Sequence, residues 1–380
     1  MSKYPKNLYQ VGDEEALLTP CLIYYEDLIR ENTARIVQMA GGAERLWPHI
    51  KTHKSLDVTR LLMSYGIVKF KAATIAEAEM CAMAGAEKIL LAYPLIGPNI
   101  RRLLQLSQAY PGSLFYGMED DLTQFGLLSE AVLSARKAGS VPETFTLPVM
   151  IDVDLGLRRT GVPLEDLKDM IRRVSRMEGL ELKGLHCYDG HRHEKDLDER
   201  DGKVLETDRI ILRMIGEMRE EGYPLPEIIA GGTPSFPCHE AHTDWYLSPG
   251  TSFIHDFGYN ESFPDLGCTP AAAVAARVVS HPGPGMFTCD CGCKAIATDP
   301  APERGRIAGM DEAVTVMQNE EHWVFRLPEG RKIPAIGEVL YILPTHICPT
   351  TALYPEILAV EKGQITKTWP VTARNRKINY

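Results

Sequence analysis

Short runs of apolar residues alternate with helix-like apolar spacing from about residue 20 to about residue 253. Apolar runs bounded by turn residues are typical of strands buried on both faces, whereas apolar residues three and four positions apart are typical of amphipathic helices. The pattern predicts eight strands, at residues 46–51, 69–74, 88–93, 113–118, 147–154, 182–188, 227–232 and 246–250. Eight strands with helical connections favour a parallel (β/α)8 barrel over an open doubly wound sheet.

Helix signals separate these strands. Thr74 is a plausible N-cap for a helix that starts at Ile75, and Pro163 opens an acidic first turn. A long charged helix runs from Lys203 to Glu221 and is ended by Gly222.

The pattern changes after about residue 255, where helical spacing fades and turn residues become frequent. Seven further strands are predicted, at 271–279, 286–290, 313–317, 323–326, 339–343, 356–361 and 364–369. We therefore expect a barrel domain over residues 19–253 and a mostly β domain over 254–380, which part of residues 1–18 joins.

Composition narrows the class of protein. The chain has 380 residues and a formal net charge of -10, which argues against nucleic acid or an anionic membrane as partner. No apolar run approaches membrane-spanning length and no signal peptide is evident, so we expect a cytoplasmic protein. The nine cysteines indicate reduced thiols. Cys289, Cys291 and Cys293 resemble a metal cluster, but small buried residues are the favoured interpretation.

Chemically capable side chains follow the predicted strands at the end where barrel enzymes place their active sites. Lys51 ends the first strand, and Arg159 follows the fifth. The other candidates are the histidines and tyrosine around the end of the sixth strand and two glycine loops after the seventh and eighth: His186, Tyr188, His191, His193, Gly231-Gly232-Thr233 and Gly250-Thr251-Ser252.

The two glycine loops predict a phosphate site. Glycine lets backbone amides approach an oxyanion, and hydroxyl side chains add donors. Ordinary strand-to-helix turns are the alternative, but two such loops on adjacent strands favour phosphate. Lys51 lies across the barrel closure from them, and its flanking residues His49 and His53 favour an uncharged amine suited to imine chemistry. The neighbouring Lys54 and Arg158 are better explained as solvated surface residues.

His346 and Cys348 form a candidate metal pair. A spacing of two places imidazole and thiolate on one side of an extended segment, and this donor pair suits Zn²⁺. Two ligands do not complete a site, so an incidental pair remains the alternative from the residues alone.

These motifs, taken in order, resemble one family. Pro-His-x-Lys-x-His-Lys at 48–54, Gly-x-x-Arg-x-Gly at 156–161, Gly-Gly-Thr at 231–233 and His-x-Cys-Pro-Thr at 346–350 are similar to the D-threonine aldolase and D-serine dehydratase family. These are fold-type III pyridoxal 5′-phosphate enzymes with a barrel like that of alanine racemase. The resemblance extends over nearly the whole chain.

The resemblance implies a Schiff base between pyridoxal phosphate and Lys51, with His49, Arg159 and Tyr188 at the cofactor. It also implies a phosphate cup of Gly231, Gly232, Thr233, Gly250 and Thr251, and a divalent metal, Zn²⁺ before Mn²⁺ or Mg²⁺, on His346 and Cys348. Relatives of this kind look dimeric, so we expect a homodimer.

The expected activity is cleavage of D-threonine to glycine and acetaldehyde, with His193, or else His191, as the base. Dehydration of D-serine or D-3-hydroxyaspartate is the alternative, because Cys348 resembles the dehydratases. A non-catalytic cofactor carrier would leave the β domain and the His346/Cys348 pair without a purpose.

Overall fold

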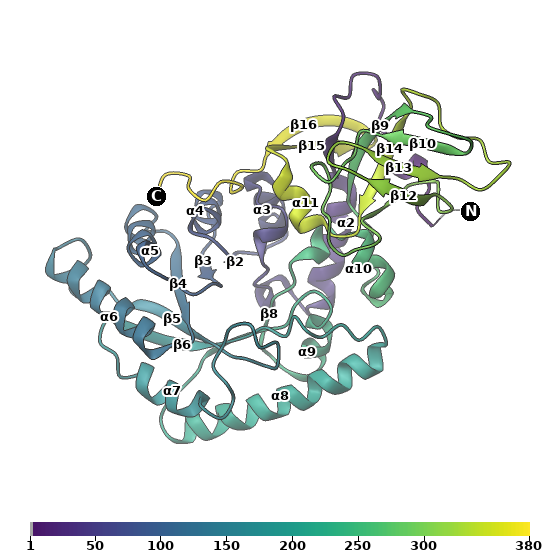
Figure 1. Ribbon diagram of the computed structural model, residues 1–380. Helices are drawn as coiled ribbons and strands as arrows, with labels where there is room; N and C mark the ends of the chain where they lie inside the picture. The colour runs from purple at the N-terminus through teal and green to yellow at the C-terminus, as the bar shows by residue number, and fades with distance from the viewer. Residues whose placement is uncertain (1–2) are drawn as a thin grey trace. The chain divides into compact units, whose positions relative to one another are not determined.

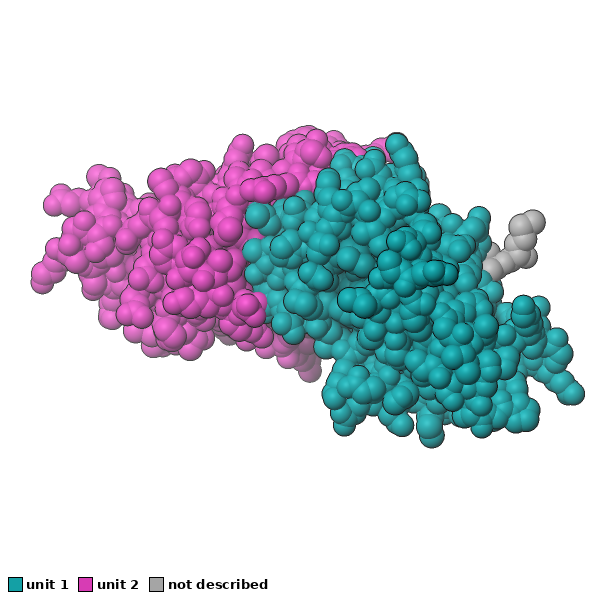
Figure 2. All heavy atoms as spheres, turned by 90° about the horizontal axis from the view of Figure 1, so that it is seen from above, with its two compact units in different colours: residues 1–36, 52–57, 251–374 teal, residues 37–51, 58–250, 375–380 magenta. Residues whose placement is uncertain are grey.

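The computed structural model describes residues 3–380 and divides into two compact units, which Figure 2 shows in different colours. Unit 1 comprises the residues up to 36, residues 52–57 and residues 251–374, whereas unit 2 comprises residues 37–51, 58–250 and 375–380. The chain thus passes from one unit to the other five times, and two of these crossings, between Lys51 and Thr52 and between Gly250 and Thr251, fall within the predicted site motifs. The two units are described in turn.

Unit 2 is built on a parallel sheet in which each strand pairs with the next along the chain (Figure 1). The strands confirm seven of the eight predicted ones: β2 (Lys69–Ala72), β3 (Lys88–Leu91), β4 (Leu114–Glu119), β5 (Leu147–Asp152), β6 (Leu180–Cys187), β7 (Glu227–Ala230) and β8 (Tyr246–Leu247).

The predicted first strand at 46–51 is wrong in its conformation. Residues 50–52 form a turn of 3-10 helix, η2 (Ile50–Thr52). The segment before it still closes the ring, since Leu46 makes a parallel bridge to Leu247 and His49 makes one to Lys71. Two prolines explain the short pairing: Pro48 has no N–H to donate, and Pro249 interrupts the neighbouring strand in the same way. The closed barrel fold that we predicted is therefore confirmed.

Helices cover the outside of this barrel, because they connect strands that run in the same direction. Their bounds are α3 (Leu56–Met63), α4 (Ile75–Ala84), α5 (Pro98–Ala109), α6 (Leu122–Lys137), α7 (Leu167–Val174), α8 (Leu197–Glu220) and α9 (Phe236–His242). The predicted cap is confirmed, since Thr74 Oγ1 accepts a hydrogen bond of 3.1 Å from Glu77 N. The helix expected at Pro163 begins only at Leu167.

An apolar layer fills the barrel interior. It consists of buried side chains from the closing segment and from four strands: Trp47, Leu90, Tyr116, Met118, Met150 and Ile229. The rings of Trp47 and Tyr116 meet edge to face at 5.3 Å. Because this layer blocks the barrel, the interior is a packed core, and ligands are confined to the ends of the strands.

Unit 1 is a mostly antiparallel sheet, as the loss of helical spacing and the frequent turn residues after about residue 255 predict. Its path is β12-β13-β10-β9-β1-β15-β16, and β14 pairs with both β9 and β11. The bounds are β1 (Cys21–Tyr25), β9 (Ala272–Ser280), β10 (Met286–Cys289), β11 (Gly305–Ile307), β12 (Val314–Gln318), β13 (Trp323–Arg326), β14 (Val339–Pro344), β15 (Glu356–Glu361) and β16 (Gln364–Pro370).

Four helices and two single turns belong wholly or, for the helix that begins at Glu26, mostly to the same unit. They are α1 (Lys6–Tyr9), α2 (Glu26–Met39), α10 (Phe257–Ser262), α11 (Ile347–Leu353), η3 (Thr251–Phe253) and η4 (Pro264–Leu266). Strand β1 pairs with β9 and β15, which is why residues 19–36 fold with unit 1 although the predicted barrel domain begins at 19.

Two observations bear on the wider class of the protein. In the part of the chain that the structure describes, no helix combines the length and the apolarity needed to cross a membrane. All nine cysteines are free thiols, and Cys289 and Cys291 are buried, in agreement with the interpretation of these two as small core residues.

Candidate functional site

Lys51 lies in unit 2 at the end of the segment that closes the barrel. It is partly buried in η2, and its backbone N–H donates to Nδ1 of His49 at 3.2 Å. This bond ties the two residues of the Pro-His-x-Lys motif together locally. His53 is different from expectation: burial lowers its pKa to about 3, so it is neutral and contributes no positive charge near neutral pH.

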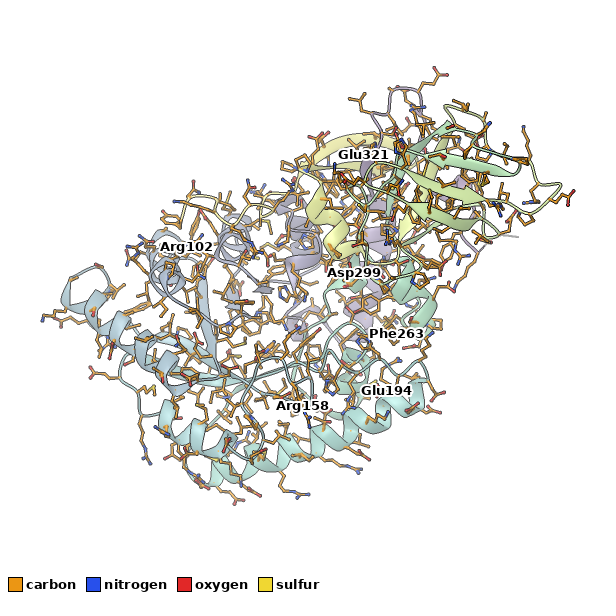
Figure 3. All side chains as sticks on the ribbon, in the orientation of Figure 1. Arg102, Arg158, Glu194, Phe263, Asp299 and Glu321 are labelled. Atoms are coloured by element: carbon orange, nitrogen blue, oxygen red, sulfur yellow. The ribbon has the colours of Figure 1, made fainter. Side chains whose placement is uncertain are left out.

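Two cations of the barrel lie over the ring of Tyr188. The Arg159 guanidinium carbon is 5.3 Å from the centre of its ring, and the Lys71 ammonium nitrogen is 5.6 Å from it. Arg158, which Figure 3 labels, has a φ of 54°, and both Arg158 and Arg159 are exposed. Of the two adjacent arginines, Arg159 is therefore the one whose side chain reaches a predicted site residue.

Lys71 belongs to a buried polar line that sequence reasoning missed. Its ammonium lies 2.9 Å from Nε2 of His186, whose Nδ1 lies 2.7 Å from a carboxylate oxygen of Asp152. The hydroxyl of Thr160 donates to the other oxygen of Asp152 at 2.7 Å. The available signal was a lysine inside the short strand Lys-Phe-Lys-Ala, where an apolar residue is the norm for a barrel interior.

The two glycine loops of unit 2 are joined by a hydrogen bond. Gly250 N donates to the Thr233 hydroxyl at 3.1 Å, so the loops after β7 and β8 meet as predicted. Gly231 has a φ of 79°, and a Cβ there would lie 2.9 Å from the His239 ring. A Cβ on Gly232 would lie 3.2 Å from the Tyr188 ring. A side chain at Gly231 would therefore clash with His239, and one at Gly232 would fill the space beside Tyr188, so glycine keeps open the cradle that a phosphorylated aromatic cofactor requires.

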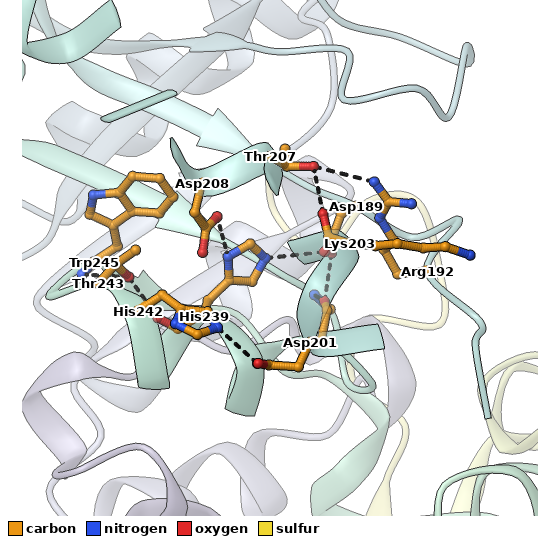
Figure 4. A network of polar contacts seen from close by, with 12 residues as sticks. Asp189, Arg192, Asp201, Lys203, Thr207, Asp208, His239, His242, Thr243 and Trp245 are labelled. Atoms are coloured by element: carbon orange, nitrogen blue, oxygen red, sulfur yellow. Dashed lines mark hydrogen bonds and ion pairs between the residues drawn. The ribbon is translucent and has the colours of Figure 1, made fainter. Parts of the chain in front are cut away.

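A network of charges holds the first of these loops (Figure 4). The Ser235 hydroxyl accepts from Gly232 N at 2.9 Å and donates to Asp189 at 2.6 Å. His239 bridges Asp189, at 3.1 Å, and Asp208, at 2.8 Å. Burial opposes its charge, but the two carboxylates raise the pKa of His239 to about 9. A buried, protonated histidine therefore pins the loop to α8.

The two candidate bases lie after β6. His193 is exposed, whereas His191 is partly buried and its Nε2 lies 3.4 Å from a Cβ built on Gly156. Burial and the charge of Arg192 lower the pKa of His191, and its buried Nδ1 has no hydrogen-bond partner within the described residues. The choice between the two histidines stays a prediction.

His346 and Cys348 lie together in unit 1. Despite the burial of both groups, their mutual hydrogen bond raises the pKa of His346 to about 9 and lowers the pKa of Cys348. Nδ1 of His346 lies 2.8 Å from Asp299 in the loop between β10 and β11, which Figure 3 labels. The hydroxyls of Thr52 and Thr251, at 3.2 and 3.5 Å, also face the sulfur. A thiolate is thus favoured, and a carboxylate orients the imidazole.

This donor set fits a metal with two protein ligands. We expected an extended segment here, and this expectation is wrong. Ile347 already begins α11, and only His346 keeps extended backbone angles. The two side chains nevertheless meet. Imidazole and thiolate are ligands of Zn²⁺, and a carboxylate on the far imidazole nitrogen is its usual companion. Across residues 3–380 there is no cluster of three or more acidic, histidine or cysteine ligands, so open positions would remain.

Known proteins resemble both parts of the chain. A family model described as the alanine racemase N-terminal domain matches residues 26–255, and one described as a putative serine dehydratase domain matches residues 271–360. The chain is 27% identical over 351 residues to the D-threonine aldolase of Arthrobacter sp, which covers 90% of this chain and 89% of that protein.

Two further relatives match nearly end to end. The D-threo-3-hydroxyaspartate dehydratase of Delftia sp. (strain HT23) is 26% identical over 380 residues, covering 92% of this chain and 96% of that protein. The crystal structure of D-threonine aldolase from Filomicrobium marinum matches with a TM-score of 0.87 at 26% identity and covers 96% of this chain and 98% of that one. With more than half of its length matched by the first family model, the chain belongs to the alanine racemase N-terminal domain family, in the group that contains D-threonine aldolase and D-serine dehydratase.

Proposed function

We propose that this chain is a pyridoxal phosphate- and metal-dependent lyase of D-3-hydroxy amino acids that cleaves D-threonine to glycine and acetaldehyde. The observation that carries the proposal is the chemistry shared by its near-full-length relatives. They are named for D-threonine, 3-hydroxy-D-aspartate and D-threo-3-hydroxyaspartate, and each of these substrates carries a hydroxyl on Cβ of a D-amino acid.

The barrel unit would hold the cofactor. The amine of Lys51 would bind its aldehyde, Arg159 its ring oxygen, and the hydroxyl of Thr233 with the glycine loops its phosphate, while Tyr188 lies beside its ring. Thr233 suits this task because its oxygen accepts from Gly250 N, which holds the hydroxyl where the two glycine loops meet. When bound, the cofactor supplies an electron sink for the bond that breaks at Cα.

Unit 1 would hold the metal on His346 and Cys348, with Asp299 fixing the imidazole. A divalent metal there supplies a Lewis acid that lowers the pKa of a substrate hydroxyl. The base that takes the hydroxyl proton is proposed to be His193, with Nδ1 of His191 as the alternative. Comparison of His193→Asn with His191→Asn decides, because the variant that loses more turnover of D-threonine marks the base.

Dehydration is the second candidate, and Cys348 is the observation that favours it, since the dehydratases resemble this chain at that position. In that reaction the hydroxyl would leave Cβ instead of losing its proton. Both reactions would use Lys51 and the same donor pair. The two reactions differ in the bond that breaks at Cβ, which is the Cα–Cβ bond in the cleavage and the Cβ–O bond in the dehydration.

Purified protein loaded with pyridoxal phosphate and Zn²⁺ should form glycine and acetaldehyde from D-threonine. We expect L-threonine to be inert, which serves as the control for stereochemistry. Pyruvate and ammonia from D-serine, with no glycine from D-threonine, would show that the dehydratase is the correct assignment. A protein that binds the cofactor but turns over neither substrate would instead be a carrier.

A further inference from the structure

The layer above the apolar core of the barrel is polar. Lys71 pairs in register with Leu90, and Asp152 pairs with His186, which pairs in turn with Ile229. Leu90 and Ile229 belong to the apolar layer, so their partners face the barrel interior as well. Asp152 follows Met150 of the same layer by two residues. This places the polar line at the end of the strands where Lys51 lies.

Lys71 and His186 join opposite sides of the barrel. Strands β2 and β6 are four steps apart in the ring, whichever way it is followed. The 2.9 Å contact between Lys71 Nζ and His186 Nε2 therefore crosses the interior. The three residues are only 2%, 5% and 4% exposed in the order Lys71, His186, Asp152. A lysine is almost never this buried unless it is paired.

The hydrogen bonds define the direction of the line. Burial opposes ionisation of Asp152, but the bonds from His186 and Thr160 hold its pKa below the ordinary value. Burial and the charge of Lys71 lower the pKa of His186, so the imidazole is neutral. Its Nδ1–H then donates to Asp152, and its Nε2 accepts from Lys71. Asp152 thereby fixes the ring that holds the ammonium in place.

The charge on Lys71 is poised near neutral pH. Burial and the positive charges of Lys51 and Arg159, against the opposing effect of Asp152 and Asp189, lower the pKa of Lys71 to about 7. With His186 and the ring of Tyr188, these are the groups that face it. The geometry independently places Lys71 beside the Lys51 motif, because its backbone bridges to His49 and its ammonium lies 5.6 Å from the centre of the Tyr188 ring.

We propose that Lys71 is a positioning residue of the cofactor site: its charge, held in place by His186 and Asp152, acts on the nitrogen of Lys51 and sets how readily that nitrogen carries a proton. The inference rests on the proposed function, since it requires the cofactor to be bound at Lys51. It assigns a purpose to a buried lysine where an apolar side chain would pack at lower cost. A neighbouring cation disfavours protonation, so Lys71 favours the uncharged nitrogen.

A spectroscopic titration tests this directly. The visible absorbance of the cofactor in the loaded full-length protein changes with protonation of the nitrogen that holds it, and the pH midpoint of that change is measured in each variant. Lys71→Met removes the cation and should raise the midpoint by about one pH unit. Lys71→Arg keeps a permanent cation and should leave the midpoint at or below the wild-type value.

Lys88→Met is the matched control. Lys88 is another lysine of the barrel interior, but it pairs with Glu227 at the start of β7 and lies 5.9 Å from the ring of Trp47, at the other end of the strands. Its loss should leave the midpoint unchanged. If Lys71→Met does not fold by circular dichroism, Lys71→Gln keeps a donor for His186 and should show the same rise.

Three results would overturn the inference. They are an unchanged midpoint in both Lys71 variants, equal shifts in Lys71→Met and Lys71→Arg, or an equal shift in Lys88→Met, each of which indicates a packing role only. A wild-type protein without a visible band contradicts the proposed function itself. A normal band with an indifferent Lys71 contradicts only the inference.

Discussion

At the scale of single residues, several ionisable groups lie where burial disfavours their charged form. Lys71, His186 and Asp152 are all less than one-tenth exposed, and so is His53, whose pKa burial lowers to about 3. Lys51 is partly buried and shares its motif with Lys54, whose φ is 49°. The two lysines differ in their environment: Lys54 folds with unit 1, where its carbonyl accepts from Ala373 N.

Lys51→Ala should abolish the visible absorbance band of the bound cofactor, because the amine that holds it covalently is removed. Lys54→Ala is the matched control and should keep the band. The measurement is an absorbance spectrum of each purified variant after incubation with pyridoxal phosphate and removal of the excess. A band that persists in Lys51→Ala and is lost in Lys54→Ala would show that the wrong lysine was assigned.

At the scale of elements, the loop after β7 depends on helices that are distant in sequence. His239 on α9 connects Asp208 on α8 with Asp189 after β6 (Figure 4). Ser235 then connects Asp189 with Gly232. A buried histidine between two carboxylates is stable only while it is protonated. The geometry of this predicted phosphate loop therefore depends on a charge that lies outside the loop.

This charge predicts how stability varies with pH. Because the folded-state pKa of His239, about 9, exceeds the ordinary value of 6.5, its contribution is fully present below about pH 6.5 and is lost as the pH rises through about 9. The contribution is about 3 kcal/mol. Urea unfolding at pH 6 and pH 9.5 should show that decrease in the free energy of unfolding.

Asp208→Asn should flatten this pH dependence, because one of the two carboxylates that stabilise the charge is gone. Asp201→Asn is the matched control, since Asp201 pairs with His242 between the same two helices at 2.9 Å but is partly exposed. An unchanged slope in Asp208→Asn, or an equal change in both variants, would exclude His239 as the cause.

At the scale of the whole molecule, the two kinds of chemistry belong to different units. Lys51, Arg159 and the glycine loops up to Gly250 lie in unit 2, whereas His346 and Cys348 lie in unit 1. Cofactor binding and metal binding are therefore expected to be separable. Each can be removed without loss of the residues that support the other.

Treatment with EDTA should abolish cleavage of D-threonine while the visible band of the cofactor remains, because the metal donors do not hold the cofactor. Added Zn²⁺ should restore activity. Conversely, Lys51→Ala should retain bound metal, as measured by elemental analysis, with Cys348→Ala as the variant that loses it. Activity that is indifferent to EDTA in a protein shown to be metal-free would contradict the metal-dependent mechanism.

Local pattern was sufficient for most of the fold. Apolar runs located seven barrel strands within a few residues and seven of the nine strands of unit 1, whereas β11 and β1 were not predicted. The closing segment around Pro48 was misjudged, because proline denies it the continuous ladder that its apolar residues suggest. Strand β1 was missed because its partners, β9 and β15, lie about 250 residues or more away along the chain.

The sequence by itself determined the barrel and the β-rich second part, because these follow from local periodicity. Lys51, Arg159, His346 and Cys348 are candidates that its motifs and their family resemblance single out. Only the tertiary structure decided which groups meet. Lys71 and His186 are 115 residues apart, and His346 and Asp299 are 47 apart. No local pattern encodes such pairs, since strand order and closure of the barrel bring them together. The buried line of Lys71, His186 and Asp152 is for that reason a property of the fold.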